Sequence, residues 1–326
     1  MGEFELLARL RERLGAPGPR VRLGAGDDAA VTVPGGATAT SVDALVEGVH
    51  FSRETAPLAS IGFKALAAAL SDLAAMGAEP GEAYTALGVP PDLDEDGCLE
   101  LLAGLEQLAA ETGTTLAGGD VSRAPVLSLA ITVVGHGPEP GRFVTRSGAR
   151  AGDAVVLTGE LGGAAAGLRL LGDPALGDAL DRGTADALRE RQLRPRPRLD
   201  EGRALAAAGA AAMIDLSDGL GGDAGHLAAE SGVRLELDMT EVPLQAGVAE
   251  VAEALGVEPL EFAAGGGEDF ELLACVAPDQ LGEAGRALEA LGCTLTVIGR
   301  CVAGEGLALS GRDRREIRPR GFDQLA

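Results

Sequence analysis

Two aspartates, Asp215 and Asp218, lie three residues apart in the stretch MIDLSDGL, with Ser217 between them. The stretch opens with a short apolar run typical of a buried strand, so the carboxylates are predicted at the strand's end. Buried carboxylates cost much free energy unless they are paired or bound to a metal. The chain carries 50 Asp and Glu against 27 Lys and Arg, a formal net charge of −23, so protein cations are scarce. A bound metal cation explains the arrangement.

Acidic residues recur where other predicted strands or helices meet loops. Oxygen ligands with no His or Cys beside them suit Mg²⁺ or a similar hard cation. Glycines flank three of these places and let a polyphosphate come close to backbone N–H groups. For any single residue the alternative is a helix cap or an ordinary turn, and taken singly the cap is preferred for Asp218 and Asp269. The acidic residues are Asp27 and Asp28 in GAGDDAA, Asp43 in TSVD, Asp72 in SDLAAMGA, Asp120 in AGGD, and Glu268 and Asp269 in GGGEDFELL.

Standard catalytic motifs are missing from the sequence. It has no GxxxxGK[ST], no GxGxxG after a strand, no HRD or DFG, no GxSxG and no HExxH. A P-loop and a protein kinase are therefore excluded, and a Rossmann dinucleotide site is disfavoured. Of three histidines, His50 in VEGVHF is the functional candidate, whereas His136 and His226 are expected to pack or to cap.

Composition limits the possible binding partners and the cellular compartment of the protein. A charge of −23 disfavours nucleic acid and anionic membrane surfaces, because both need clustered cations. The sequence contains no run of 18 apolar residues, so no transmembrane helix is expected. The four cysteines have no CxxC spacing and are expected to be buried thiols, which points to a reducing cytoplasm.

The hydrophobic pattern predicts a two-domain protein of the α/β or α+β class. A length of 326 residues exceeds what one core usually serves. A stretch rich in Gly and Pro, 135–153, is interpreted as the boundary, which gives domains 1–137 and 138–326. Strands are expected at 37–46, 82–89 and 154–159, and in TTLAGGD, VLSLAITVVG, AAMIDL, VRLELD, FELLACV and TLTVIGRCV. Helices are expected at 58–78, 94–113, 163–172, 184–193, 199–209 and 219–231, with further helices between VRLELD and FELLACV.

Seven motifs in this order resemble the thiamine-monophosphate kinase family over nearly the whole chain. They are GAGDDAA, SVDALVEGVHF, KALAAALSDLAAMGA, AGGDVSR, VTRSGARAGD, IDLSDGL and GGGEDFELL. The resemblance implies the fold of aminoimidazole ribonucleotide synthetase, with two α/β domains and a homodimer in which the first-domain sheets pair. It also implies ATP-dependent phosphorylation of thiamine monophosphate to thiamine diphosphate.

The resemblance also implies roles for individual residues. Metal would be held by Asp28, Ser41, the backbone of Val42, Asp43, Asp72, Asp120, Asp215 and Asp218. ATP would contact Gly119, Asp120, Arg146 and Ser217, and thiamine phosphate would contact His50, Glu268 and Phe322.

A metal-assisted in-line transfer needs no covalent nucleophile and no strong base, because a phosphomonoester with a second pKa of about 6 is largely deprotonated near pH 7. Several Mg²⁺ ions are expected, with ATP as co-substrate.

Other readings of the sequence predict different features. Selenophosphate synthetase would need a reactive Cys near the N-terminus, and residues 1–40 have none. The hydrogenase-maturation relative would end in a cysteine-bearing tail, whereas this chain ends GFDQLA. Aminoimidazole ribonucleotide synthetase itself suits SDLAAMGA and VEGVHF less well. An inactive binding protein would bind ATP without turnover, and a structural acidic protein would show no stabilisation by Mg²⁺.

Overall fold

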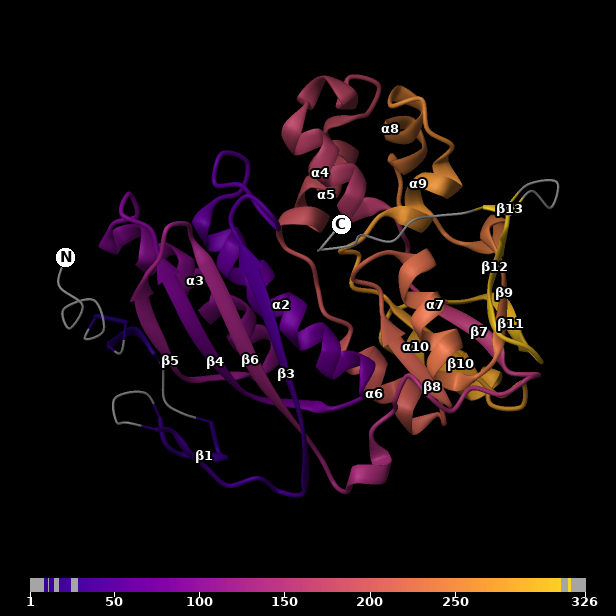
Figure 1. Ribbon diagram of the computed structural model, residues 1–326, viewed down its shortest axis with the longest axis horizontal. Helices are drawn as coiled ribbons and strands as arrows, with labels where there is room; N and C mark the ends of the chain where they lie inside the picture. Colours follow the sequence, from indigo (N-terminus) through magenta and orange to yellow (C-terminus); the bar gives the residue numbers. More distant parts are fainter. Residues whose placement is uncertain (1–8, 11, 15–17, 25–28, 312–315, 318–326) are drawn as a thin grey trace. The chain divides into compact units, whose positions relative to one another are not determined.

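The computed structural model describes residues 9–10, 12–14, 18–24, 29–311 and 316–317. They divide into two compact units, Met1–Leu73 with Ala78–Arg142, and Ala74–Gly77 with Phe143–Ala326. Each unit combines strands with helices, as the hydrophobic pattern predicts (Figure 1).

The first unit is built on a four-stranded sheet in the order β3-β6-β4-β5. Side chains alternate along β6, so that Leu129, Ile131 and Val133 are buried on one face. Leu73 of α2 packs on this face against Gly135. The elements are β3 (Ala37–Val46), β4 (Glu79–Val89), β5 (Thr115–Arg123), β6 (Ser128–Gly137), α2 (Leu58–Ala75) and α3 (Glu95–Thr112), with a small hairpin of β1 (Val21–Leu23) and β2 (Val31–Thr32).

Helices α2 and α3 cross at two glycines. A Cβ on Gly104 would stand 1.7 Å from the carbonyl oxygen of Ala59, and a Cβ on Gly62 would stand 2.0 Å from that of Leu101. Only glycine allows the two backbones to come this close. The crossing therefore fixes α2, the helix that carries Asp72.

The second unit is built on a seven-stranded mixed sheet in the order β13-β12-β9-β11-β7-β10-β8. Its strands are β7 (Ala154–Thr158), β8 (Ala212–Asp215), β9 (Arg234–Asp238), β10 (Leu272–Val276), β11 (Leu295–Val302), β12 (Gly306–Ser310) and β13 (Glu316–Ile317). Its α-helices are α4 (Gly163–Gly172), α5 (Arg182–Leu193), α6 (Leu199–Ala207), α7 (Leu220–Ser231), α8 (Val248–Ala254), α9 (Pro259–Gly265) and α10 (Leu281–Ala290), and its short 3₁₀ helices are η2 (Pro174–Gly177) and η3 (Met239–Glu241). The short helix η1 (Pro140–Arg142) belongs to the first unit.

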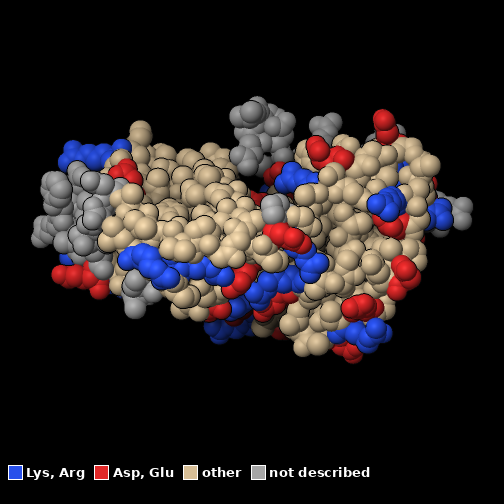
Figure 2. Space-filling view, turned by 90° about the horizontal axis from the view of Figure 1, so that it is seen from below, with Lys and Arg blue, Asp and Glu red and all other residues tan. Residues whose placement is uncertain are grey.

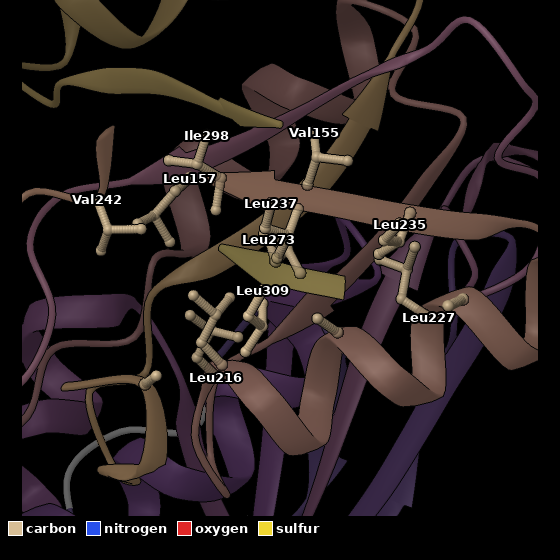
Figure 3. Packing of buried hydrophobic residues seen from close by; sticks show 14 of the residues in the cluster. Val155, Leu157, Leu216, Leu227, Leu235, Leu237, Val242, Leu273, Ile298 and Leu309 are labelled. Carbon is tan, nitrogen blue, oxygen red and sulfur yellow. The ribbon is translucent and has the colours of Figure 1, made fainter. Parts of the chain in front are cut away.

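Leu216, which lies between Asp215 and Asp218 in MIDLSDGL, belongs to the core of the second unit. It is buried together with Leu227 of α7, Leu273 of β10 and Leu309 of β12 (Figure 3). Burying a leucine side chain contributes about 1.5–3 kcal/mol. This anchor holds the loop that follows β8, so Asp215 and Ser217 flank a fixed point.

Most of the expected elements are present. The predicted strand at 37–46 and helix at 163–172 have the observed bounds, and the predicted helix at 58–78 ends earlier, at Ala75. The four cysteines are free and buried, as predicted. Strands β1, β2, β12 and β13 and helix α10 had not been predicted.

Among the described helices, only α2 is long and apolar enough to cross a membrane, and 83% of its apolar window is buried inside the protein. That degree of burial is what a core helix shows.

The crossing of α2 and α3 gives a testable prediction. We expect Gly104→Ala to destabilise the protein by about 1–3 kcal/mol, because the added methyl group overpacks the crossing. Gly285→Ala in α10 is the matched control, since nothing lies within 4 Å of its Cβ position. It should stabilise by up to about 1 kcal/mol through helix propensity. Urea unfolding of both variants measures this, and equal effects would contradict the close crossing.

Candidate active site

In the first unit, β3 and α2 bring two predicted ligands together. The Ser41 hydroxyl donates a hydrogen bond to Oδ2 of Asp72. Ser41 pairs with Val133 of β6 and Asp43 pairs with Ile131, so both lie on the face of the sheet that α2 covers. Both positions are half-buried. Ser41 and Asp72 therefore form an oxygen-lined pair, and Asp43 lies on the same face of the sheet.

Gly119 and Asp120 lie on β5, the strand at the opposite edge of the same sheet from β3. Register places Gly119 in the row of Asp43, three strand spacings of about 4.8 Å away. A Cβ on Gly119 would stand 2.1 Å from the oxygen of Thr85, so only glycine fits. Asp120 is exposed in the next row, with Ala86, and accepts a hydrogen bond from Ser122 at 2.9 Å. Alternation turns it to the opposite face, away from Asp72.

His50 ends the turn that follows β3. Its ring Nδ1 accepts a hydrogen bond from the N–H of Val46 at 3.1 Å, and its own N–H donates to the oxygen of Val46 at 2.9 Å. The turn is held by Glu47, which pairs with Arg53 at 2.7 Å. A ring nitrogen that accepts carries no proton, so in the neutral imidazole the proton is on Nε2. His50 is therefore preset as a hydrogen-bond donor through Nε2.

In the second unit, two loops are joined at the end of β8. The N–H of Leu216 donates to the oxygen of Glu271, and the N–H of Glu268 donates to the oxygen of Ser217, both at 2.8 Å. Asp215, the last residue of β8, is 4% exposed. Asp215, Ser217, Asp218 and Glu268 are thus gathered at one edge of the sheet.

Negative charge accumulates at this edge. Desolvation raises the pKa of Asp218, the charge of Glu268 raises it further, and the charges of His226 and Arg146 lower it. Arg146 follows Thr145, whose oxygen accepts a hydrogen bond from Met213 of β8 at 3.0 Å. The predicted ATP ligand Arg146 is therefore close enough to Asp218 to act on its charge.

Asp218 does not cap α7, so the capping alternative is wrong for this residue. The N-cap is Gly219, with φ 103° and no side-chain cap. The reason is that a second carboxylate, Asp223 in the first turn of α7, accepts the N–H of Asp218 at 3.1 Å. Asp223 is buried, and desolvation raises its pKa to about 7. Sequence reasoning missed Asp223 as an organiser of this loop.

Asp269 does cap a helix, though a distant one. Its buried carboxylate accepts from Gly162 at 2.7 Å and from Ala164 at 3.0 Å, at the start of α4. Its neighbour Glu271 is 0% exposed and accepts from Arg191, Arg198 and Thr158. These two acidic residues hold the loop in place, and Glu268 lies on that same loop.

The chemistry of the predicted ligand atoms suits a hard cation. The ligands predicted from the sequence are all oxygens, and at the edge of β8 they gather negative charge around Asp218. Within the described residues, however, no three His, Cys, Asp or Glu side chains form a complete metal cluster. The predicted ligands are divided between the two units. Asp28 and Phe322 lie outside the described residues.

The two units correspond to two known domain families. Residues 26–136 match the AIR synthase related protein, N-terminal domain, and residues 150–312 match the C-terminal domain. The fold is therefore that of the AIR synthase related proteins.

Similar proteins narrow the family further. The chain is 40% identical to the thiamine-monophosphate kinase of Escherichia coli K12, covering 100% of this chain and 98% of that protein. The solved thiamine-monophosphate kinase of Stenotrophomonas maltophilia K279a is 36% identical, with a TM-score of 0.81, over 96% of this chain and 95% of that one. AaThiL complexed with AMPPCP and TMP is 32% identical, with a TM-score of 0.77, over 87% and 86%. The chain belongs to the thiamine-monophosphate kinase family.

The raised pKa of Asp223 predicts how the stability of the metal-free protein depends on pH. Its folded pKa of about 7 exceeds the ordinary aspartate pKa of 3.8, so the folded state binds the proton more tightly. Stability from this group therefore falls as the pH rises between these two values. We expect Asp223→Asn, which keeps an acceptor oxygen for Asp218, to flatten this dependence. Melting curves in EDTA at pH 5 and pH 8 measure it, and an unchanged difference between the two would refute the assignment.

Proposed function

We propose that the protein transfers the γ-phosphoryl group of ATP to the phosphate of thiamine monophosphate and so forms thiamine diphosphate. The observation that carries this proposal is the gathering of Asp215, Ser217, Asp218 and Glu268 at the end of β8, in a chain 40% identical to a thiamine-monophosphate kinase. A solved relative binds AMPPCP, an ATP analogue, together with TMP.

Several Mg²⁺ ions would be held by the carboxylates predicted from the sequence. In the first unit these are Asp43 and Asp72 with the Ser41 hydroxyl and the Val42 backbone, and Asp120 on the other face of the sheet. When bound, Mg²⁺ neutralises charge on phosphate oxygens and links them to carboxylates. The remaining ligands would be Asp28, Asp215 and Asp218.

The other site residues bind and orient the substrates. Gly119, Asp120, Arg146 and Ser217 would contact ATP. Gly119 presents bare backbone, and the exposed Arg146 provides a cation. His50, Glu268 and Phe322 would contact thiamine monophosphate. No side chain has to act as nucleophile, since the acceptor phosphate is already largely deprotonated near pH 7.

The domain roles, assembly and location are part of the same proposal. Residues 1–137 would supply metal and ATP ligands, and residues 138–326 would complete the substrate site. A homodimer is supported by β3, a ten-residue edge strand that among the described strands pairs with β6 alone and exposes 63% of Val42. Four free buried thiols favour the cytoplasm. On the face shown in Figure 2, basic side chains lie among acidic ones, which does not favour nucleic acid as a partner.

The activity itself is tested with purified protein, ATP and Mg²⁺. We expect thiamine monophosphate to be converted to thiamine diphosphate and free thiamine to be a poor acceptor, because its neutral hydroxyl needs a general base. EDTA should abolish turnover. Asp72→Asn, which keeps an acceptor for Ser41 but loses the charge, should raise the Mg²⁺ concentration needed for half-maximal rate. Faster phosphorylation of thiamine than of its monophosphate would refute the proposal.

The tautomer of His50 gives a second prediction. Gln places its amide N–H₂ near the position of Nε2, whereas the shorter Asn reaches only the position of Nδ1. We therefore expect His50→Gln to keep most of the affinity for thiamine monophosphate. His50→Asn should raise its KM by about 10- to 100-fold, the value of one hydrogen bond to a charged group. Steady-state kinetics decide this, and equal losses in both variants would show that Nε2 is not the donor.

A further inference from the structure

The loop that carries Glu268 has an unusual backbone. Glu268 has φ 68° and Phe270 has φ 49°, and these are the two non-glycine residues with positive φ among those described. Side chains disfavour this region, so surrounding contacts must hold it. On one side of the loop, the N–H of Glu268 donates a hydrogen bond to the oxygen of Ser217, and the N–H of Phe270 donates to the oxygen of Leu216.

The last turn of α5 holds the other side of the loop. Arg191 donates to the backbone oxygen of Asp269 at 2.9 Å and to the carboxylate of Glu271. The next residue, Gln192, donates from Nε2 to Oε2 of Glu268 at 2.8 Å. This turn lies close to α4, because a Cβ on Gly167 would stand 2.0 Å from the oxygen of Leu188. Two consecutive residues of one helix thus contact the strained loop.

Gln192 is a costly residue at this position. It is 5% exposed, and its Oε1 is buried with no hydrogen-bond partner among the described residues. An unsatisfied buried oxygen destabilises the fold, and an apolar side chain of the same length would avoid that cost. The amide orientation is settled by chemistry, because an ionised carboxylate accepts only and must face the N–H₂ group. Packing therefore explains the size of Gln192 but not its amide.

We propose that Gln192 is a positioning residue that orients the carboxylate of Glu268 toward the substrate. A neutral amide fixes one carboxylate oxygen and leaves the negative charge of Glu268 in place, which an arginine partner would cancel. A charged, oriented carboxylate suits a ligand with a cationic ring, and the thiazolium ring of thiamine monophosphate has this charge. The inference rests on the proposed function and adds a residue through which Glu268 acts.

The test compares Gln192→Met with a matched control. Methionine keeps the length of the side chain and removes both amide groups. Gln107→Met is the control, because Gln107 makes the same bond to a glutamate, Glu111, at 2.9 Å, on the exposed face of α3. For each protein we measure KM for thiamine monophosphate, KM for ATP and the melting temperature, and we solve a crystal structure without substrate. Both kinetic measurements are repeated in a Glu268→Gln background.

We expect Gln192→Met to raise KM for thiamine monophosphate by at least about tenfold, the value of one hydrogen bond to a charged group. KM for ATP should change less than twofold, and the melting temperature should not fall, since the unsatisfied oxygen is gone. In the Glu268→Gln background the substitution should change nothing further. The crystal structure should show the Glu268 carboxylate displaced, and the control should match the wild type throughout.

Other outcomes overturn the inference. An unchanged KM with an unmoved Glu268 would show that the amide has no positioning role. An equal loss with and without Glu268 would show that Gln192 acts by another route. A lower melting temperature with a normal KM would make the residue structural. If the wild type does not phosphorylate thiamine monophosphate, the proposed function fails, and the position of Glu268 in the two crystal structures alone decides the positioning role.

Discussion

The buried carboxylate of Glu271 is the interaction on which the site of the second unit depends. The carboxylate accepts hydrogen bonds from Arg191, Arg198 and Thr158. The backbone oxygen of Glu271 accepts a hydrogen bond from the N–H of Leu216. Removing one partner of a buried ion pair costs about 3–5 kcal/mol, because the other charge stays buried and unpaired. Glu271 therefore fixes the loop that carries Glu268, and through Leu216 it fixes the loop that carries Ser217. The residues proposed to meet substrate and ATP are positioned by a group that need not touch either.

The same region explains why an acidic protein gathers more acid at the end of a strand. Asp218, Asp223 and Glu268 lie close enough for desolvation and mutual repulsion to raise the pKa values of Asp218 and Asp223. Such an edge is electrostatically unfavourable by itself, and the proposed divalent cation would make it favourable. In the first unit, Ser41 and Asp72 form a second oxygen-lined group. The substrates of the proposed reaction carry negative phosphates, which carboxylates repel unless these carboxylates hold cations.

Local patterns predicted most of the elements and the strand-end position of Asp215, since both follow from hydrophobic periodicity. They did not predict tertiary partners. Taken singly, Asp269 was interpreted as a helix cap or turn residue, and it does cap a helix, but that helix, α4, begins at Gly163, more than 100 residues away. Taken singly, Asp218 was interpreted as the cap of the helix that follows it, but the N-cap is Gly219, because Asp223 binds the N–H of Asp218. Gln192 had no sequence signal at all: its partner Glu268 is 76 residues away, and a glutamine at the end of a helix is ordinary.

The central claim, that these carboxylates hold the cations that hold the phosphates, is tested most directly by anomalous diffraction from crystals grown with Mn²⁺, AMPPCP and thiamine monophosphate. Manganese replaces Mg²⁺ at oxygen sites and gives a signal that locates each ion. The account predicts peaks beside Asp215 and Asp218 and beside Ser41 and Asp72, each also in contact with a phosphate oxygen. Phosphates bound only by arginine and backbone N–H groups, with no manganese at these carboxylates, would contradict it.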